Sequence, residues 1–512
     1  MNAKINNATF AFIALLGVAA VVLAISSLSW EYEHDTPLLQ YTGLLIVKFG
    51  MIPYRDFFET SMPGVFLFHS AIIYLFGSGD AAFACVNLIF IGFILLMSWL
   101  YLARIDQTTA TAFVPLYAVV YFVGGPGMIL QRDFLAILPI ITAMALVAAG
   151  WPRKLLMRQG MCGLLLGAAA LIKPQLALGG PLVLLADILL DATEKRRSGI
   201  PLKKIDYFIA AGSAAAGTAI PVAITIKWLA ANGALEDFLF VIREYLPLHI
   251  QQSFGHVFLP SGQRAWYVAR WALRANGYLY LAPIPQLCAF GAWQIWKLDT
   301  KKGILLSLAF GMTLVYGLTP AISGQFWPYH YMPLIFFLTM TISLLLYVSL
   351  LNENSRFRLI ALRTAFVAGS IILIAKGSAL TEFGHNRAKQ GRVDRIVKAM
   401  QANLRPGDTV QPIDWTDGVI HAMLRLELPI ATPFLYDYHF HHNVNTVAIQ
   451  TIRRRFMAAF DKAAPTLLVE APNRHKVSGR DTDAAFPAFD SVVAQKYSLV
   501  YQEQDFRIFR KK

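Results

Sequence analysis

The sequence predicts a polytopic α-helical membrane protein with about 11 transmembrane helices and a small C-terminal α/β domain. Three features of the composition support this class. Of the 512 residues, 56% are hydrophobic and only 15% are charged, and the mean hydropathy is +0.51. Soluble domains carry about 25% charged residues. A soluble core cannot accommodate this excess of apolar side chains, so most of the chain is expected to lie in a membrane.

The first apolar stretch, Ala8–Leu28, is longer than the apolar core of a signal peptide, which has about 7–15 residues, and no cleavage motif follows it. We therefore expect an uncleaved first span. Pro174 and the pair Gly179-Gly180 predict a break between two short helices further along. Because a spanning helix needs about 20 mostly apolar residues, we place the spans at 8–29, 81–103, 109–125, 134–150, 161–175, 177–191, 207–231, 276–296, 303–322, 331–351 and 359–379.

The loops between these spans divide by charge, as the positive-inside rule requires. Lys4 precedes the first span, and alternate loops then hold the basic groups Arg153, Lys154 and Arg158; Lys195, Arg196, Arg197, Lys203 and Lys204; Lys297, Lys301 and Lys302; and Arg356 and Arg358. All of these segments fall on one side, predicted to be cytoplasmic together with the N-terminus. They account for the net charge of +14, and no basic helix with interleaved aromatic residues indicates nucleic-acid binding.

The opposite, outer side receives residues 30–80, 126–133, 232–275, 323–330 and everything after about 380. Pro63–Phe76 is apolar but too short to span comfortably, and 232–252 has a similar character, so we expect both to form helices in the membrane interface. We divide the chain into a transmembrane module, 1–380, whose first outer loop is 30–80, and a soluble extracytoplasmic domain, 381–512.

The last 130 or so residues have the pattern of a small α/β domain. The segment RPGDTVQPID predicts a turn followed by a strand, and APTLLVEAP predicts a buried strand. TDGVIHAMLRLEL predicts a helix whose N-terminus is capped by Thr416 or Asp417. The end of the chain, YSLVYQEQDFRIFRK, predicts a hairpin that turns around Glu503-Gln504-Asp505.

Ionisable residues at the level of a membrane are candidates for function, and four clusters of candidates map to the outer side. Each cluster also has a structural interpretation. The acids and Arg55 of the first loop could be a solvated loop with local ion pairs, and Arg132-Asp133 could be an ordinary helix start. Lys173 could be a snorkelling lysine, and Tyr329 and His330 could belong to an aromatic belt. Glu31 and Glu33 fit the solvated interpretation better than Asp35, which lies deepest in the loop. The candidates are Asp35, Arg55, Asp56 and Glu59; Arg132 and Asp133; Lys173; and Tyr329 and His330.

Cysteine and histidine spacing predicts no metal centre. Cys85, Cys162 and Cys288 all lie within apolar stretches and lack any CxxC or Cys/His pattern, so we expect neither a disulfide framework nor a zinc site. No other ligand spacing demands a metal, and the sequence requires no cofactor.

The order of the motifs along the chain resembles the GT-C glycosyltransferases. An acid in the first outer loop is followed by GMIPYRDFFETSMPG, an apolar interface helix, an Arg-Asp pair after the third span, a Lys-Pro pair around the fifth and PYHYMPL late in the chain. The resemblance is nearest to the bacterial branch with the lipid A aminoarabinose transferases, the rhizobial lipopolysaccharide-core galacturonosyltransferases and the protein O-mannosyltransferases. It covers nearly the whole chain.

The resemblance implies an enzyme that takes a sugar from a polyprenyl-phosphate donor at the outer face of the bacterial inner membrane. The acceptor would be an envelope lipid, polysaccharide or protein, and a divalent metal is compatible with this superfamily. Asp35 matches the catalytic acid of the family, Asp133 the second carboxylate and Lys173 the cation near the fifth span. The sequence departs from the pattern at Thr36, where relatives often carry glutamate, and at Met62, where they commonly carry a basic residue.

The chemistry of such a transfer agrees with these positions. The acceptor hydroxyl needs a base, which contributes roughly 10²–10⁴ in rate, and the phosphate leaving group needs cations. We expect Asp35 to be the base and the anomeric centre to invert. Because Met62 supplies no cation, we expect the cations that bind the donor phosphate to be among Arg55, Arg132, Lys173 and the arginines of 264–274. The full set assigned to donor or substrate binding is Arg55, Asp56, Glu59, Arg132, Lys173, Tyr329 and His330.

Two other classes of function explain part of the sequence. A secondary transporter or lipid flippase of the envelope accounts for the spans and the intramembrane charges, but not for the long first loop or the outer soluble domain. A non-enzymatic envelope protein, such as a polysaccharide-assembly partner, is the third hypothesis.

Overall fold

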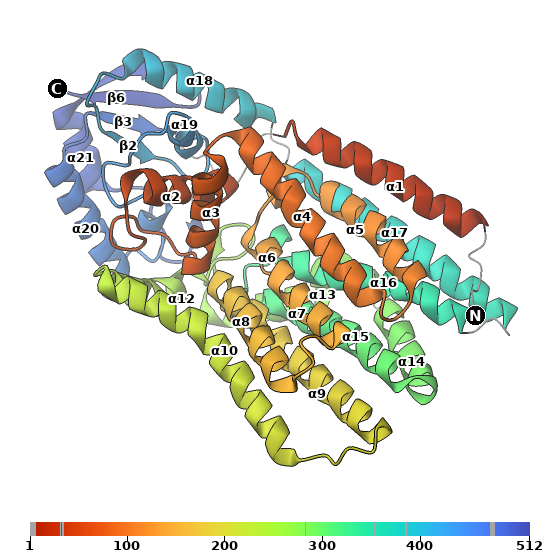
Figure 1. The fold of residues 1–512 in the computed structure, drawn as a ribbon. Coiled ribbons are helices and arrows are strands. Elements are labelled where there is room, and N and C mark those ends of the chain that lie inside the picture. Colours follow the sequence, from red (N-terminus) through yellow and green to blue (C-terminus); the bar gives the residue numbers. More distant parts are fainter. Residues whose placement is uncertain are drawn as a thin grey trace.

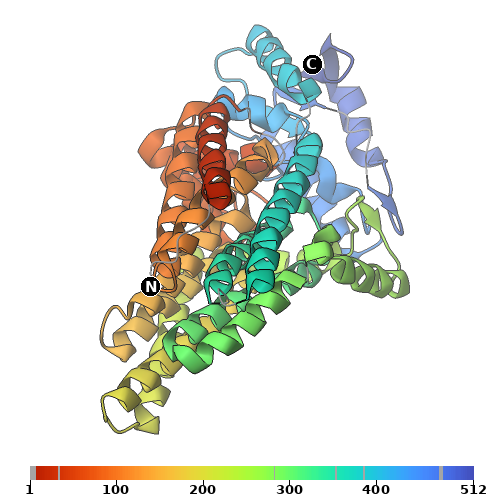
Figure 2. The same ribbon diagram turned by 90° about the vertical axis from the view of Figure 1, so that its right-hand side faces the viewer.

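We describe the protein from a computed structural model, which covers residues 7–30, 32, 35–281, 283–351, 355–384, 387–471 and 477–512. Glu31 and Glu33, predicted to be the solvated end of the first span, lie outside these ranges. Long helices form a bundle, and a region that contains a small sheet lies at one end of it (Figures 1 and 2). The N-terminus of helix α1 points away from that end.

Within the described ranges, nine helical segments are long and apolar enough to cross a membrane. Two further predicted spans correspond to shorter helices of 16 residues each, α5 (Gln107–Phe122) and α14 (Pro283–Leu298). The multi-pass architecture predicted from hydropathy is therefore confirmed. The nine segments are α1 (Asn7–Ser27), α4 (Asp80–Leu102), α6 and α7 (Arg132–Leu135 and Ile137–Ala149), α8 (Leu155–Ile172), η2 and α9 (Pro174–Gly179 and Gly180–Arg197), α10 (Lys204–Ala231), α15 (Thr300–Ser323), η5 and α16 (Pro328–Tyr331 and Met332–Leu350), and α17 (Arg356–Gly384).

Helices α8 and α10 pack closely because glycine lets their backbones approach each other. A Cβ atom added at Gly163 would lie 2.2 Å from the carbonyl oxygen of Ala214, and one added at Gly217 would lie 2.2 Å from that of Gly160. Small residues serve this purpose in membranes, where lipid tails provide no hydrophobic force between helices. The predicted break after α8 is also confirmed, since Pro174 begins the 3₁₀ turn η2.

One element of the charge pattern is corrected by the structure. Arg158 was placed in a cytoplasmic loop, but α8 already begins at Leu155. The Nε atom of Arg158 lies 2.5 Å from Oδ1 of Asp187 in α9, and the two side chains are only 5% and 0% exposed. The pair is internal because a charge between packed helices requires a partner of opposite sign. Arg153 and Lys154 remain in the loop, so the orientation argument is unchanged.

Short helices gather at the end of the bundle that carries the sheet. The helix predicted at 63–76 is confirmed with the same bounds, α3 (Pro63–Phe76), and it packs against α2 (Asp35–Phe49); its location in the membrane interface stays a prediction. The segment predicted around 232–252 forms α11 (Leu235–Phe240), η3 (Val241–Tyr245) and α12 (Leu246–His249). It is followed by α13 (Ser261–Arg274) and η4 (Ala275–Leu281). The 3₁₀ turns η1 (Pro126–Met128) and η6 (Asp437–Phe440) complete this end.

The C-terminal sheet has the order β2-β3-β6-β5. Strands β2 (Val410–Ile413) and β3 (Leu467–Glu470) pair in parallel, with Val410 opposite Leu467. Strands β5 (Tyr497–Gln502) and β6 (Arg507–Lys511) form the predicted terminal hairpin. Helices α18 (Arg387–Asn403), α19 (Val419–Arg425), α20 (Val447–Ala463) and α21 (Pro487–Lys496) surround the sheet, and β1 (Val257–Phe258) pairs with β4 (Ser478–Gly479) beside it.

The predicted cap of α19 is wrong. Neither Thr416 nor Asp417 caps the helix; the carboxylate of Asp414 accepts hydrogen bonds from the backbone N–H groups of Asp417, Gly418 and Val419 at 2.8, 3.2 and 2.9 Å. Asp417 instead forms an ion pair with Arg392 at 3.1 Å. The cap lies further upstream because the chain turns at Thr416, where φ is +58°.

The sheet region is attached to the first loop by several polar contacts. The backbone N–H of Phe58 donates to the carbonyl oxygen of Pro433 at 2.6 Å, and the Tyr41 hydroxyl donates to that of Leu428 at 2.8 Å. Lys48 forms an ion pair with Glu427. These contacts connect residues almost 400 positions apart, and they hold the first loop against the C-terminal region.

Candidate active site

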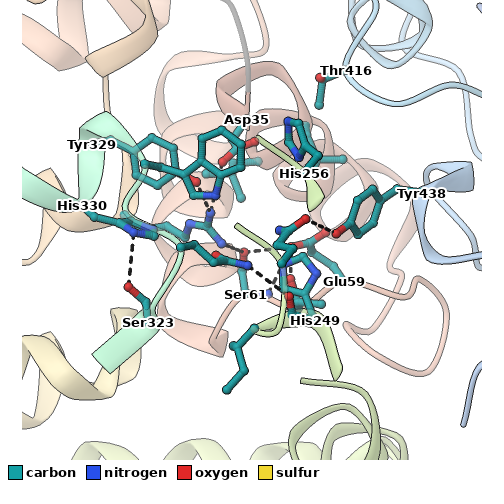
Figure 3. Close-up of a pocket in the computed structure, with 18 of the residues that line it drawn as sticks. Asp35, Glu59, Ser61, His249, His256, Ser323, Tyr329, His330, Thr416 and Tyr438 are labelled. Carbon is teal, nitrogen blue, oxygen red and sulfur yellow. Dashed lines mark hydrogen bonds and ion pairs between the residues drawn. The ribbon is translucent and has the colours of Figure 1, made fainter. Parts of the chain in front are cut away.

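A cavity of about 1330 Å³ lies where the bundle meets the C-terminal region. Its walls come from all the segments predicted to share the outer side, so the topology inferred from charge places them together correctly. Figure 3 shows the cavity and the side chains that point into it. Among the residues that line it are Asp35, Glu59, Ser61, Met62, Arg132, Lys173, His249, Gln252, His256, Ser323, Trp327, Tyr329, His330, Trp415, Asp417, Tyr438 and Asp505.

Asp35 and Arg132 form an ion pair at the centre of the site. The Nη2 atom of Arg132 lies 3.1 Å from Oδ2 of Asp35, and the two side chains are 21% and 26% exposed. Nη1 of Arg132 donates to the Ser61 hydroxyl at 3.1 Å, and Nη2 also approaches the Tyr329 hydroxyl at 3.4 Å. The buried Nε atom of Arg132 has no hydrogen-bond partner among the described residues. The guanidinium is still partly accessible, since Arg132 lines the cavity and its side chain is 21% exposed.

Local sequence explains why these two groups meet. Asp35 is the first residue of α2, where the helix dipole favours a carboxylate. The next residue, Thr36, is fully buried and donates its hydroxyl to the carbonyl oxygen of Ile129 at 2.9 Å. This bond ties the start of α2 to the loop that precedes Arg132, the first residue of α6. The departure from the family pattern at Thr36 thus has a structural role.

Lys173 and Asp133 form a second, more deeply buried pair. The Nζ atom of Lys173 lies 3.0 and 2.9 Å from the two carboxylate oxygens of Asp133. Lys173 is 15% exposed and lines the cavity, whereas Asp133 is only 2% exposed and lies behind it. The lysine reaches this place because α8 ends at Ile172 and the chain turns at Pro174. Asp133 therefore acts on the cavity through Lys173.

The aromatic motif late in the chain supplies another part of the wall. Tyr329 and His330 belong to η5, which precedes α16. His330 is 4% exposed, and its Nδ1 atom lies 3.2 Å from the Ser323 hydroxyl. The two rings meet edge to face, with centroids 4.8 Å apart. Both residues face the cavity, as a substrate-binding role requires and as an outward-facing aromatic belt would not.

Glu59 joins the first loop to the C-terminal region. Its side chain is 2% exposed. One carboxylate oxygen accepts hydrogen bonds from the backbone N–H and the hydroxyl of Ser61, at 3.1 and 2.9 Å. The other accepts the hydroxyl of Tyr436 at 2.7 Å. Glu59 thus positions Ser61, whose hydroxyl accepts a hydrogen bond from Arg132.

Arg55 and Asp56 are not brought to the cavity. They form an ion pair with each other at 2.7 Å, and Arg55 also donates to the carbonyl oxygen of Asn232 at 2.7 Å. The hydrogen bonds from Arg55 hold the pKa of the Asp56 carboxyl below its usual range. Neither residue belongs to the cavity lining. Their predicted role in donor binding stays a prediction, and their position favours a structural role in the loop.

Several residues of the site were not singled out from the sequence. His249 ends α12, Gln252 and His256 lie in the loop that follows, and Trp415 and Tyr438 come from the C-terminal region. Burial, with a smaller contribution from the positive charge of Arg132, lowers the pKa of His249 to about 4. Its imidazole is therefore neutral at pH 7. The sequence feature that could have revealed these residues is the pair of histidines in LHIQQSFGHVF. The charge pattern places this segment on the outer side together with the other candidates.

The described residues do not offer a metal site: no group of three or more histidine, cysteine, aspartate or glutamate side chains converges on one point among them. The donor set that a divalent metal would need is therefore not met by this part of the chain, and we derive no step through a metal.

Comparison with solved structures identifies the fold. ArnT from Cupriavidus metallidurans, in a crystal structure bound to undecaprenyl phosphate, aligns with 98% of this chain and 98% of its own, with a TM-score of 0.55 and 13% sequence identity. The chain has the GT-C fold. The archaeal oligosaccharyltransferase AglB from Archaeoglobus fulgidus, in complex with an inhibitory peptide and a dolichol-phosphate, aligns with 91% of this chain and 69% of its own, with a TM-score of 0.49 and 12% identity.

The GT-C fold expected from the resemblance is thus confirmed over nearly the whole chain, including the C-terminal sheet. Sequence comparison alone adds nothing to this result, since no family model and no curated protein matches the chain.

Proposed function

We propose that this protein is a membrane glycosyltransferase that moves a sugar from a polyprenyl-phosphate donor to an acceptor in the cell envelope. The observation that carries the proposal is the meeting of two cations, Arg132 and Lys173, with the accessible carboxylate of Asp35 in one cavity of a GT-C fold. The undecaprenyl phosphate bound to the similarly folded ArnT supports a lipid phosphate as the donor group.

The donor phosphate binds the two cations in this proposal. Arg132 lines the cavity and carries a planar guanidinium fork that suits phosphate oxygens. Lys173 supplies a compact positive charge held in place by Asp133. Tyr329 and His330 complete this part of the cavity, which we name the phosphate subsite. The cations stabilise the charge that develops on the phosphate as the bond to the sugar breaks.

Donor binding then activates the base. In the structure Asp35 is held by Arg132, so its carboxylate is engaged. A phosphate on the guanidinium competes for the same donor atoms and releases Asp35. The carboxylate takes the proton of the acceptor hydroxyl while the acceptor oxygen bonds to the anomeric carbon. The bond from that carbon to the phosphate oxygen breaks, and the phosphate leaves with the electron pair. A single displacement of this kind inverts the anomeric centre.

Asp133 and Glu59 have positioning roles in this scheme. Asp133 fixes Lys173, and Glu59 fixes Ser61, which in turn contacts Arg132. We assign neither of them a direct step in the reaction.

The same geometry, with the charge pattern, supports a placement in the membrane. We propose a bacterial inner membrane, with the N-terminus and the basic loops in the cytoplasm and the cavity at the outer face. Near the end of α3, Tyr74, Leu75 and Phe76 are 78%, 67% and 51% exposed, which provides an apolar surface for lipid on the helix that begins next to Met62 of the cavity lining. The prenyl chain of the donor would lie along this helix.

The decisive experiment compares Asp35→Asn with a matched control. Cells that produce each variant are analysed by mass spectrometry of their envelope glycolipids, polysaccharides and proteins. Loss of the base is expected to lower the modification rate by roughly 10²–10⁴. Asp237→Asn serves as the control because Asp237 lies at the same end of the molecule, pairs with Arg455 and does not line the cavity. Near-normal modification by Asp35→Asn at normal expression would refute the role of Asp35.

A further inference from the structure

The cavity has a second half that the transfer scheme above does not use. Four aromatic rings follow one another along its wall: Trp327, His256, Trp415 and Tyr438. The ring centroids of Trp327 and His256 are 4.6 Å apart, those of His256 and Trp415 are 4.4 Å apart, and those of Trp415 and Tyr438 are 4.6 Å apart. We name this set the aromatic wall. In Figure 3, His256 and Tyr438 lie on the opposite side of the view from His330, with Asp35 between them.

The backbone is strained where it presents this wall. His256 has a φ of +56°, Thr416, next to Trp415, has +58°, and Phe326, next to Trp327, has +60°. A β-branched residue such as threonine is a genuine outlier in this region. Non-glycine residues in this left-handed region are energetically unfavourable, and they cluster at sites where function requires a particular geometry. Three such residues at or beside the rings of one wall indicate that the protein requires these rings at these positions.

Charged and amide groups form the rim of the wall. Arg392 pairs with Asp417 at 3.1 Å and with Asp505 at 3.0 Å, and all three line the cavity. Gln252 also lines the cavity and accepts a hydrogen bond from the Tyr438 hydroxyl. Flat aromatic faces bordered by carboxylates, a guanidinium and an amide match a pyranose ring. Its C–H groups pack on the aromatic face while its hydroxyls bond to the rim.

The same surroundings do not suit an extended peptide. One established way to hold such a ligand is to add it as a strand to an exposed sheet edge, where main-chain hydrogen bonds bind it. None of the described strands contributes to the cavity lining; Trp415, Asp417 and Asp505 all lie in connections outside the strands. The wall therefore favours a ligand that is recognised by its rings and hydroxyls.

We propose that the aromatic wall is the acceptor subsite and that the acceptor is a saccharide, the sugar part of an envelope glycan or glycolipid. This inference rests on the proposed function and narrows its acceptor. The donor sugar would be attached at the phosphate subsite, the accepting sugar would pack on Trp415 and Trp327, and Asp35 would lie between them to take the proton of its hydroxyl.

The test measures the two subsites separately in the full-length protein, reconstituted in nanodiscs. Undecaprenyl phosphate is the probe of the phosphate subsite. An array of bacterial envelope oligosaccharides, paired with an array of peptides, is the probe of the aromatic wall. The variants are Trp415→Leu, which keeps an apolar side chain without an aromatic face, and Trp415→Phe, which keeps the face. His256→Leu removes a second ring from the same wall.

We expect the protein to bind oligosaccharides. Trp415→Leu and His256→Leu should each weaken that binding by about tenfold, the value of one aromatic contact, and Trp415→Phe should retain most of it. Affinity for undecaprenyl phosphate should be unchanged in all three, which also shows that they are folded. Binding of peptides alone, binding to neither array, or full saccharide affinity in both leucine variants would overturn the acceptor assignment. Failure of the unaltered protein to bind undecaprenyl phosphate would instead overturn the proposed function.

Discussion

The buried pair of Lys173 and Asp133 allows a sharp test of how the phosphate subsite is held together. Lys173 is 15% exposed and Asp133 only 2%, and both carboxylate oxygens contact the ammonium. Asp133→Asn removes the negative charge and leaves the ammonium without its partner. Lys173→Met does the reverse and leaves a carboxylate that is almost completely buried.

Breaking a buried ion pair from one side costs about 3–5 kcal/mol, because a charge remains without compensation, whereas replacing both partners is often neutral. Each single variant is therefore expected to lose about 3–5 kcal/mol of stability, and the double variant Asp133→Asn/Lys173→Met should regain most of it. The coupling between the two sites should reach several kcal/mol. An exposed pair such as Glu194 and Lys301, with exposed fractions of 70% and 41%, should show at most about 1 kcal/mol.

The assay is unfolding in mixed micelles titrated with dodecyl sulfate, followed by circular dichroism, for the two singles, the double and Glu194→Gln. Binding of undecaprenyl phosphate is measured in parallel. The double variant should be stable but should bind undecaprenyl phosphate about 10–100-fold more weakly, since one charge-assisted contact of about 1.5–3 kcal/mol is missing. Additive losses of stability in the double variant would refute the pairing argument. Normal undecaprenyl phosphate affinity in that variant would remove Lys173 from the phosphate subsite.

Three further predictions concern other contacts. Gly217→Ala should impair folding and expression because its Cβ would lie 2.2 Å from a backbone oxygen of α8, while Gly212→Ala on the same helix, with nothing within 4 Å, should be tolerated. His249 has a folded pKa of about 4 against an ordinary 6.5. Protonation therefore favours the unfolded chain below pH 6.5, and His249→Gln should reduce the loss of stability on acidification from pH 6.5 to 4.5 by at most about 1.4 kcal/mol per pH unit. Arg132→Lys should weaken undecaprenyl phosphate binding roughly tenfold because a lysine lacks the planar fork, and an unchanged dissociation constant would contradict its assignment.

The sequence was informative wherever a short stretch determines its own structure or its own side of the membrane. The bounds of α3 follow from an apolar run between Pro63 and Gly77, and the turn after Lys173 follows from Pro174. Arg132, Lys173 and His330 were brought together in the prediction because each stands at the same end of its span. Alternation of charge in the loops is sufficient to place such residues in one layer.

Contacts between distant segments could not be predicted in this way. Arg132 and Asp133 are neighbours in the chain, yet one pairs with Asp35 and the other with Lys173, because successive helical residues point in different directions. The cap of α19 was assigned wrongly because the left-handed turn at Thr416 carries no sequence signal. The aromatic wall was missed for the same reason. Its rings come from four separate segments, and only the folded chain brings them together.

The lining of the cavity extends from Asp35, at the start of the first loop, to Asp505, in the turn between the last two strands. Every residue of the proposed phosphate subsite precedes residue 331, whereas the rim of the aromatic wall is completed by Asp505. A chain that ends before residue 505 would therefore keep Arg132, Lys173 and Asp35 but lose a carboxylate that pairs with both Arg392 and Arg395.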